Sequence, residues 1–314
     1  MKYDLFSIGE ILIDMTPHNV DGKILYEANP GGAPFNVLTM ANRFDIKTSF
    51  AGAVGCDGFG QDLLRLIKKE GIDTRFFKHH DHLNTSLAFV HLDKEGERSF
   101  SFFRESSADY QLDINPNDLI GIFDNFYFGS VALSKEPMAT TIRSYLADNK
   151  SELKKVFFDP NYRPHIWPDE VLAYEAINSV LAYVDVLKVS EEEALFITGM
   201  KTSTDALDHL HGQGIEVIYM TLGKDGALLS RASKQVKLAP YPVNQVIDST
   251  GAGDGFFGSV IGYLIERAKS KNLDMTDYIT AGQYGTITGG LCVQGHGAIP
   301  SYPDLDRVKE VYGG

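Results

Sequence analysis

The sequence predicts a doubly wound α/β domain, in which helices flank a mostly parallel sheet. Short apolar runs bounded by turn residues recur along the chain, and segments with helical periodicity lie between most of them. This alternation is typical of parallel strands that are joined by crossover helices. The expected strands are 4–9, 48–54, 126–133, 156–159, 184–190 and 217–222.

Length, charge and cysteine content narrow the class of protein. A chain of 314 residues predicts one large domain with a smaller appendage. The net charge of −13 does not suit nucleic-acid binding, and no apolar run reaches the roughly 18 residues of a membrane span. The N-terminus lacks the apolar core of a signal peptide, and Cys56 and Cys292 lie far apart. We therefore expect a cytoplasmic protein without disulfides, membrane contact or nucleic-acid partner.

The clearest helix spans residues 57–70. Asp57 can cap its N-terminus, and Gly71 can end it. Phe59, Leu63 and Ile67 share one apolar face. Helices of this kind complete the expected α/β alternation.

The segment 85–104 breaks this alternation. It is predicted to form two strands around a turn at 93–97, and the period of two places Phe102 and Arg104 on one face with Phe100. The segment 15–30 has no strong helical pattern and can pair with this hairpin. We interpret the two as a small sheet that stands off the main domain, a candidate lid formed by about 12–33 and 85–108. An ordinary edge hairpin is the alternative.

The segment 248–254, Asp-Ser-Thr-Gly-Ala-Gly-Asp, carries the main chemical signal. A strand-like run ends at Asp248, and a helical pattern follows over 255–269. Gly251, Ala252 and Gly253 are therefore expected at a helix N-terminus, where small residues leave backbone N–H groups open to an anion such as phosphate.

Asp254 directly follows these small residues, where its carboxylate would repel a bound anion. The position makes sense if Asp254 takes the proton of an attacking hydroxyl group, because base and oxyanion hole then share one turn of chain. Phosphoryl transfer depends mostly on such positioning and charge stabilisation. A glycine-rich turn with a capping aspartate is the structural alternative.

A nicotinamide-dependent dehydrogenase is a further alternative. Gly253, Gly255 and Gly258 fit the G-x-G-x-x-G dinucleotide pattern after a strand-like run. That pattern needs an acidic residue about 20 positions further on, at the end of the next strand. Asp274 and Asp277 are the available acids, but their surroundings are not strand-like. Neither a Walker A loop nor a protein-kinase motif is present.

Two motifs make the whole chain resemble the ribokinase-like carbohydrate kinases, also called the phosphofructokinase B family. One is 248–256, and the other is 31–36, Gly-Gly-Ala-Pro-Phe-Asn. The resemblance implies a single Rossmann-like kinase domain over 1–314 with a β lid. It also implies phosphoryl transfer from ATP to a sugar hydroxyl, with Asp254 as the base beside the anion hole.

The resemblance assigns roles to three further groups of residues. Glu193 would organise Mg²⁺ and its waters, since carboxylates are ligands that Mg²⁺ prefers. The expected sugar-binding residues are Asp14, Gly31, Gly32, Asn36, Arg104 and Arg163; the expected nucleotide-binding residues are Lys188, Glu193, Thr221, Gly223 and Gly226; and the expected monovalent-cation loop contains Asp248, Thr250, Cys292, Gly295, Gly297 and Ser301.

The segment 159–167, Asp-Pro-Asn-Tyr-Arg-Pro-His-Ile-Trp, points to the sugar. It is similar to fructokinases and, less closely, to 2-keto-3-deoxygluconate kinases. The keto acid needs more positive charge in the pocket, and Arg104 with Arg163 can serve either sugar. We expect conversion of D-fructose to fructose 6-phosphate with ATP and Mg²⁺, with K⁺ as a candidate activator, and a homodimer that forms through the lid. The histidines of 79–82 are interpreted as a solvated loop rather than a metal site.

Overall fold

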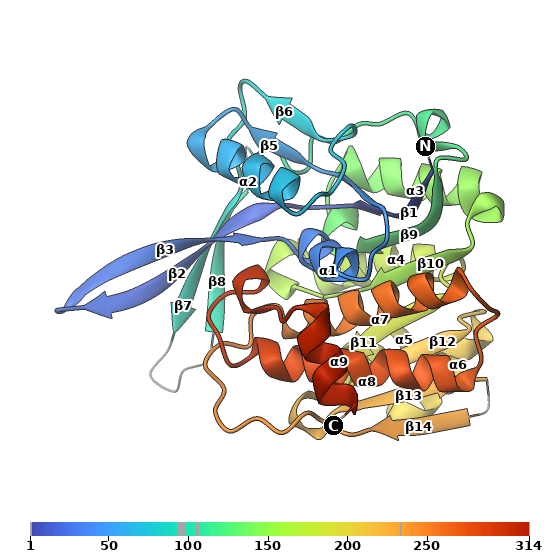
Figure 1. Ribbon diagram of the computed structural model, residues 1–314. Coiled ribbons are helices and arrows are strands. Elements are labelled where there is room, and N and C mark those ends of the chain that lie inside the picture. Colours follow the sequence, from blue (N-terminus) through green and yellow to red (C-terminus); the bar gives the residue numbers. More distant parts are fainter. Residues whose placement is uncertain (1, 93–97, 105–106, 233, 314) are drawn as a thin grey trace.

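The computed structural model describes residues 2–92, 98–104, 107–232 and 234–313, so the expected turn at 93–97 lies outside the described residues. Within them, eight strands form one sheet in the order β14-β13-β12-β11-β10-β9-β1-β4 (Figure 1). The strands from β12 to β4 are parallel, and β13 and β14 add an antiparallel edge. The bounds are β1 (Tyr3–Ile8), β4 (Thr48–Ala51), β9 (Phe123–Gly129), β10 (Lys155–Asp159), β11 (Val186–Ser190), β12 (Val217–Thr221), β13 (Ala227–Arg231) and β14 (Lys234–Leu238).

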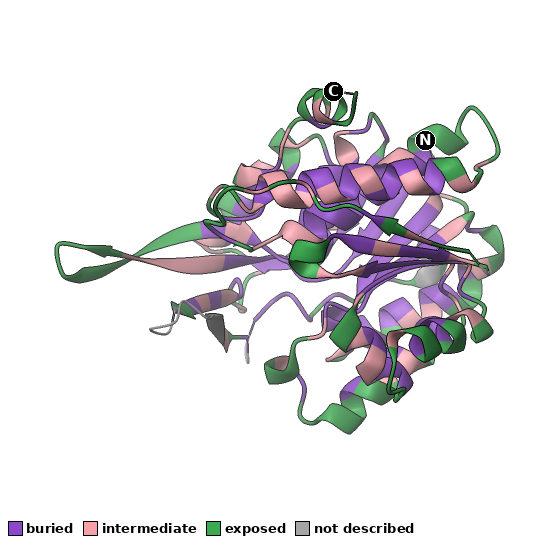
Figure 2. Ribbon diagram, turned by 90° about the horizontal axis from the view of Figure 1, so that it is seen from below, coloured by how far each residue is buried: buried purple, intermediate pink, exposed green. Residues whose placement is uncertain are grey.

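Helices cover both faces of this sheet, and each layer encloses its own apolar core (Figures 1 and 2). Phe257 and Val260 belong to one core, and Ile142 and Ile177 belong to the other. The predicted doubly wound α/β fold is confirmed. The first layer contains α1 (Ala33–Asn42), α2 (Gly58–Lys69), α7 (Ala252–Ala268), α8 (Met275–Cys292) and α9 (Leu305–Gly313), and the second contains α3 (Met138–Asn149), α4 (Glu170–Leu181), α5 (Glu191–Thr198) and α6 (Ser203–Gly212).

Two of the expected strands end earlier than the sequence indicated. The run 126–133 stops at Gly129, and 131–133 forms a 3-10 turn. The run 48–54 divides at Gly52, where an added Cβ would lie 2.6 Å from the Phe50 ring. Beyond it, β5 (Ala53–Gly55) leaves the main sheet and pairs with β6 (Lys78–His80). The expectation of a loop was therefore wrong for the first two histidines of 79–82, because they belong to β6.

Helix α2 begins and ends where its sequence signals predict. Oδ1 of Asp57 accepts a hydrogen bond from the Gly60 backbone N–H at 2.8 Å, which satisfies a donor of the first turn. Gly71 follows the helix with φ of +74°, a left-handed conformation that favours glycine. The predicted cap and stop are both confirmed.

The described residues also form a four-stranded sheet, β3-β2-β7-β8, which projects from the main domain (Figure 1). β2 pairs antiparallel with β3 and parallel with β7, so the predicted pairing of 15–30 with the hairpin is confirmed. All four strands fall within 12–33 and 85–108. Their bounds are β2 (Leu12–Val20), β3 (Lys23–Gly31), β7 (Leu87–Leu92) and β8 (Arg98–Phe103).

Candidate active site

A cavity of about 740 Å³ lies at the carboxyl ends of the central strands. Glu10 follows β1, Asn161 follows β10, and Ser190 ends β11, and all three line the cavity. In the sheet, β1 lies between β4 on one side and β9 on the other. Later strands are thus added on both sides of β1, which makes this a topological switch point. Open α/β sheets bind their ligands at such points. Asp14 and Phe102, from the four-stranded sheet, line the cavity as well.

Helix α7 starts at Ala252 rather than at the predicted 255, so the small residues form its first turn. Gly251 precedes the helix with φ of +77°, and an added Cβ there would lie 2.2 Å from Cβ of Ala298. A Cβ on Gly253 would lie 3.2 Å from Nζ of Lys188. Glycine is therefore needed for both the turn and the close approach, and it leaves the helix N-terminus open to an anion.

The strand predicted before this helix is absent from the described residues around 246–248. Both Ile247 and Asp248 donate their backbone N–H groups to the Val293 carbonyl, at 2.8 and 3.2 Å. Val293 follows the last residue of α8. The apolar side chains suggested a strand, but Val246 is 62% exposed and its segment pairs with a helix end instead of a strand.

The dinucleotide interpretation also fails, because two glycines of its pattern serve helix packing. An added Cβ on Gly255 would lie 2.8 Å from the Tyr302 ring, and one on Gly258 would lie 2.6 Å from the Val37 carbonyl oxygen. Both glycines lie inside α7, where they let α1 and the C-terminal segment approach closely. Their spacing therefore reflects packing, and the dehydrogenase alternative is wrong.

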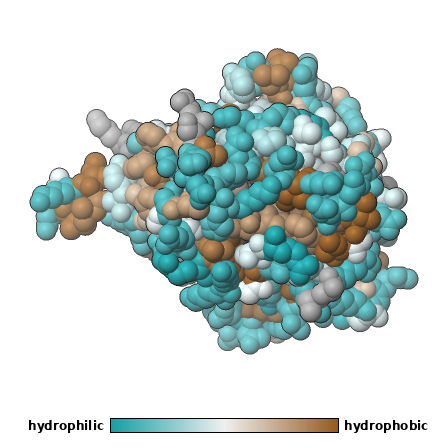
Figure 3. Space-filling view, turned by 90° about the horizontal axis from the view of Figure 1, so that it is seen from above, coloured by the Kyte–Doolittle hydropathy of each residue, from teal (hydrophilic) through white to brown (hydrophobic). Residues whose placement is uncertain are grey.

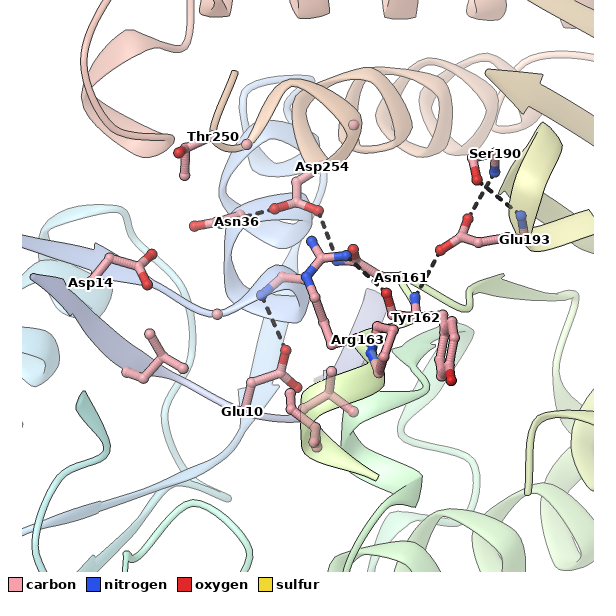
Figure 4. Close-up of a pocket in the computed structure, with 18 of the residues that line it drawn as sticks. Glu10, Asp14, Asn36, Asn161, Tyr162, Arg163, Ser190, Glu193, Thr250 and Asp254 are labelled. Atoms are coloured by element: carbon pink, nitrogen blue, oxygen red, sulfur yellow. Dashed lines mark hydrogen bonds between the residues drawn. The ribbon is translucent and has the colours of Figure 1, made fainter. Parts of the chain in front are cut away.

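Asp254 lies in the first turn of α7 and is only 9% exposed (Figure 4). Its Oδ2 accepts a hydrogen bond from Nδ2 of Asn36 at 2.9 Å, and its Oδ1 accepts one from Nδ2 of Asn161 at 3.4 Å. These two residues come from α1 and from the segment after β10. Three distant parts of the chain thus hold this carboxylate at the cavity wall.

The surroundings of Asp254 also set its proton affinity. Burial raises the pKa of its carboxyl group above the usual value, while the Asn36 hydrogen bond and the Lys188 and Arg163 charges oppose the rise. A raised pKa makes a carboxylate a better proton acceptor. The geometry and the pKa direction both suit proton abstraction from a hydroxyl group in the cavity.

Five of the six expected sugar-binding residues line the cavity, namely Asp14, Gly32, Asn36, Arg104 and Arg163. A Cβ on Gly31 would lie 2.2 Å from Oδ2 of Asp14, so glycine makes room for that carboxylate. Gly32 has φ of +106°, and a Cβ there would lie 2.5 Å from the Glu10 carbonyl oxygen. The paired glycines let the end of β3 approach two acidic residues.

The two arginines expected to bind sugar differ in environment, although both line the cavity. Arg104 is 5% exposed, and its Nε and Nη2 donate to Oδ2 of Asp109. Arg163 is exposed and donates from Nη1 to the Tyr162 carbonyl at 3.2 Å. Phe102 lies half-buried beside the cavity, and the side chain of Phe100 lies outside the described residues.

Lys188 and Glu193 also line the cavity, and Nζ of Lys188 approaches Gly253 in the first turn of α7. Nζ of Lys188 donates to Oδ2 of Asp159 at 2.9 Å. Burial alone would lower the Lys188 pKa, but the carboxylates of Asp159 and Glu193 outweigh this effect and raise it. Lys188 therefore stays charged, which its expected role as an anion-binding residue requires.

The carboxylate of Glu193 has two structural partners. Its Oε2 accepts from the Ser190 N–H at 2.7 Å and completes a capping box for α5, and its Oε1 accepts from the Tyr162 N–H at 2.7 Å. Glu193 therefore helps to cap the N-terminus of α5. Each carboxylate oxygen keeps a second lone pair, so contact with water or metal is still available.

The other residues expected to contact nucleotide lie beside the cavity rather than in its wall. Thr221 ends β12, and the turn that follows places Gly223 and Gly226 at φ of +57° and +91°. A Cβ on Gly226 would lie 2.2 Å from the Leu238 carbonyl oxygen. These glycines form a tight turn between β12 and β13, and Lys188 and Glu193 are the expected nucleotide ligands that the cavity brings together.

The residues expected around a monovalent cation lie close to one another. Oδ1 of Asp248 accepts from the Thr250 N–H at 2.6 Å, and its Oδ2 accepts from the Gly297 N–H at 3.0 Å. The thiol of Cys292 donates to the Thr250 carbonyl at 3.5 Å. The hydroxyl of Ser301 binds the His296 carbonyl at 2.9 Å, and a Cβ on Gly295 would lie 2.4 Å from that hydroxyl oxygen. Carbonyl and carboxylate oxygens of this kind suit a hard cation.

Sequence reasoning missed three polar residues of this region. Glu10 and Asn161 line the cavity, and Asp159 lies beneath it as the partner of Lys188. Each of these residues lies at the end of a predicted strand, which is a signal that the sequence offered. Glu10 follows the strand 4–9, and Asp159 and Asn161 lie at the end of the strand 156–159. An acidic residue or amide at a strand end is often merely solvated, so only the three-dimensional structure separates these residues from others of their kind.

The described residues contain no cluster of three or more histidine, cysteine, aspartate or glutamate side chains that could hold a metal ion. Cys56 is exposed, Cys292 is buried, and both are free thiols. Among the helices of the described ranges, none is both long and apolar enough to span a bilayer.

The sheet, the open helix N-terminus and the buried carboxylate define a phosphotransferase that uses an alcohol group as acceptor. A model of the pfkB family of carbohydrate kinases matches residues 2–305, and the chain belongs to this family. Probable fructokinase-5 of Arabidopsis thaliana is 33% identical over 95% of this chain and 94% of its own.

Solved structures resemble the chain over almost its full length. A fructokinase double mutant of Vibrio cholerae, in a form described as bound to fructose, ADP and potassium, has a TM-score of 0.88 and 28% identity, with 98% of each chain covered. A ribokinase II of Escherichia coli, described as putative and in complex with ATP and magnesium, has a TM-score of 0.87 and 25% identity, with 99% of each chain covered. The predicted kinase family and fold are confirmed.

Proposed function

We propose that this chain is an ATP-dependent fructokinase, which converts D-fructose to fructose 6-phosphate. The observation that carries the proposal is the position of Asp254. Its buried carboxylate faces the cavity from the first turn of α7, directly after Gly251 and Gly253. A proton acceptor and an anion-binding helix terminus thus lie within one turn of each other.

In the proposed reaction, the terminal hydroxyl group of the sugar donates a hydrogen bond to Asp254. The proton moves to the carboxylate as the hydroxyl oxygen forms a bond with the γ-phosphorus of ATP. The bond between that phosphorus and the bridging oxygen of ADP breaks in the same step. Backbone N–H groups of Gly251, Ala252 and Gly253 and the ammonium of Lys188 stabilise the negative charge on the transferred group.

The metal requirements follow from the available oxygen ligands. We propose that Glu193 binds waters of the Mg²⁺ that accompanies ATP, because both of its oxygens already accept backbone hydrogen bonds. The loop around Asp248 and Thr250 is the proposed K⁺ site. A bound K⁺ would supply positive charge next to the start of α7. The turn at Thr221, Gly223 and Gly226 is the proposed contact for the rest of the nucleotide.

The charge of the cavity favours a neutral sugar over a sugar acid. Its positive side chains are Arg104, Arg163 and Lys188, and the first and third already pair with buried carboxylates. Its acidic side chains include Asp14 and Asp254, together with Glu10, Glu192 and Glu193. A keto acid would enter a cavity with excess negative charge. The names of the fructokinase relatives support the same substrate.

We further propose that the four-stranded sheet is the lid of this cavity and the contact between two copies of the chain. Its strands expose the apolar side chains of Ile24 (64%), Leu25 (53%) and Phe103 (64%) to solvent. The projecting hairpin carries hydrophobic residues near its end (Figure 3). Exposed apolar groups of this kind mark interaction surfaces. A cytoplasmic location accords with the two free thiols.

A coupled assay of ADP release tests the proposed function. Purified protein is supplied with ATP, Mg²⁺ and one acceptor at a time: D-fructose, 2-keto-3-deoxygluconate, ribose, tagatose phosphate or a nucleoside. D-fructose is expected to give the highest kcat/KM, and replacing K⁺ with Na⁺ is expected to lower it. Preference for another sugar would reject fructose as the substrate, and no ADP release with any acceptor would reject the kinase.

A further inference from the structure

Three buried polar atoms, each in a residue that lines the cavity, have no hydrogen-bond partner among the described residues. They are Oε2 of Glu10, Oδ1 of Asn36 and Nη1 of Arg104. Their side chains are deeply buried, with residue exposures of 4%, 3% and 5%. Buried polar atoms are nearly always paired, so unpaired atoms in a cavity wall indicate that a ligand supplies the missing partner.

Glu10 is held in position by one of its two carboxylate oxygens. Oε1 accepts a hydrogen bond from the Ala33 N–H at 3.2 Å, at the first residue of α1 (Figure 4). The backbone is fixed as well, because a Cβ on Gly32 would lie 2.5 Å from the Glu10 carbonyl oxygen. The contact with α1 therefore orients the side chain and leaves Oε2 for another donor.

Arg104 is also held on one side. Nε and Nη2 bind Oδ2 of Asp109, and Oδ1 of Asp109 accepts from the hydroxyls of Ser86 and Ser107 at 2.6 Å each. The guanidinium lies 4.3 Å from the centre of the Tyr110 ring. These contacts fix the side chain and neutralise its charge, and Nη1 is left without a partner.

Glu10 and Arg104 have complementary requirements. A carboxylate oxygen only accepts hydrogen bonds, and a guanidinium nitrogen only donates them. Both side chains line the same cavity, and the Arg104 charge opposes the burial-driven rise in the Glu10 pKa. A hydroxyl group satisfies both at once, because its O–H donates to Glu10 while its oxygen accepts from Arg104. We infer that Glu10 is a specificity-determining residue that, together with Arg104, binds one hydroxyl of the acceptor sugar.

This inference rests on the proposed sugar-kinase function and adds a consequence for selectivity. A sugar that lacks the bound hydroxyl would leave both buried groups unpaired. Sites built to hydrogen-bond a substrate hydroxyl reject analogues without it far more strongly than apolar pockets reject a missing methylene. The enzyme should therefore discriminate strongly at one particular hydroxyl position, which is not the phosphorylated one.

The test combines variants of Glu10 with analogues of the sugar. Wild type, Glu10→Gln and Glu10→Asp are assayed with D-fructose and with fructose analogues that each lack one hydroxyl group. Glu175→Gln is the matched control, because it makes the same chemical change on the exposed side of α4. The Glu10→Gln variant should raise the KM for fructose about 10-fold or more, with smaller changes in kcat and in the KM for ATP.

The decisive quantity is the penalty for removing each hydroxyl group. One analogue should lose about 10-fold less kcat/KM in Glu10→Gln than in wild type, since the contact is already broken. Additive penalties for every analogue, or an unchanged KM for fructose, would overturn the role of Glu10. If Glu10→Gln fails to fold, Glu10→Asp provides the same comparison. A wild-type protein that phosphorylates no sugar would instead refute the proposed function.

Discussion

Asn36 and Asp254 are 218 positions apart in the sequence, yet Nδ2 of Asn36 donates a hydrogen bond of 2.9 Å to Oδ2 of Asp254. The bond joins the motif that begins α1 to the motif that begins α7. It stabilises the charged form of Asp254 and so opposes the effect of burial on the pKa. The two family motifs are therefore parts of one site, in which the first adjusts the proton affinity of the second.

Replacing Asp254 with Asn should remove the proposed base while keeping the side-chain shape. We expect kcat to fall by about 10²- to 10⁴-fold, because an amide cannot accept the hydroxyl proton. Fructose and ADP should still bind, and calorimetry measures this directly. Turnover within a few-fold of wild type would exclude Asp254 as the base.

The Asn36→Leu variant should shift the pH dependence of catalysis. Without the amide hydrogen bond, the Asp254 pKa rises further, and a protonated carboxyl group cannot act as a base. The acid limb of the kcat/KM profile should therefore move to higher pH, which steady-state assays at a series of pH values can measure. Asn161→Gly is the comparison, since its contact is longer at 3.4 Å, and glycine keeps the positive φ of 42°. An equal or larger shift of the acid limb in Asn161→Gly would contradict the expectation that Asn36 affects the Asp254 pKa more than Asn161 does.

The Lys188→Met variant should be strongly destabilised, because it leaves the buried carboxylate of Asp159 without its cation. Breaking one partner of a buried ion pair costs about 3–5 kcal/mol. The loss should be largest at high pH, where Asp159 is fully ionised, and adding Asp159→Asn should recover most of it. Urea unfolding at pH 8 gives the free energy of unfolding of wild type, of Lys188→Met and of the double variant with Asp159→Asn. Equal stability of the single and double variants would show that the ion pair has no such role.

Glu10→Gln should change the pH dependence of stability. Burial raises the pKa of Glu10 to about 7 from 4.5, so the folded chain binds the extra proton between these values. Stability from this group is present below pH 4.5 and is lost as pH rises through 7. A shift of this size corresponds to roughly 3 kcal/mol, which the neutral variant does not lose.

The measurement compares the free energy of unfolding of wild type and Glu10→Gln at pH 5 and pH 8. Asp159 and Asp254 also have raised pKa values, but both proteins contain them. Their contributions cancel in the difference between the two proteins, which therefore reports on Glu10. The variant should gain relative stability at pH 8. Parallel pH curves would mean that Glu10 is ionised at no cost in the fold.

The sequence predicted the elements and the two motifs well, because periodicity, caps and glycine patterns are local. Asp57 and Gly71 bounded α2 as expected. Features that depend on three-dimensional packing could not be predicted from the sequence. Gly258 fitted a nucleotide pattern, but its lack of a side chain serves packing, because an added Cβ would lie 2.6 Å from the Val37 carbonyl oxygen. Val246 has a β-branched side chain typical of strands, but it belongs to no strand of the described residues.

The same distinction applies to the site. Asp254, Asn36 and Lys188 were expected from the family resemblance, and all three line the cavity. Asn161 could not, because its contribution depends on a left-handed backbone conformation and on an amide that reaches α7. Glu10 could not be predicted from the sequence either, because an acidic residue after a strand is usually solvated. Only its burial and its unpaired carboxylate oxygen distinguish it.

The projecting sheet gives a prediction about assembly. If a second copy of the chain covers its exposed apolar side chains, wild type should sediment as a dimer at micromolar concentration, and replacing Leu25 with Asp should weaken dimerisation at least about 100-fold. Leu25 is 53% exposed, so the monomer fold should keep its thermal stability. Val171→Asp on α4 is the matched control, because Val171 is 64% exposed but lies far from this sheet in sequence and belongs to another layer. A monomeric wild type, or an equal effect of both variants, would contradict dimerisation through the lid. A dimer that persists in Leu25→Asp would place the contact elsewhere on the molecule.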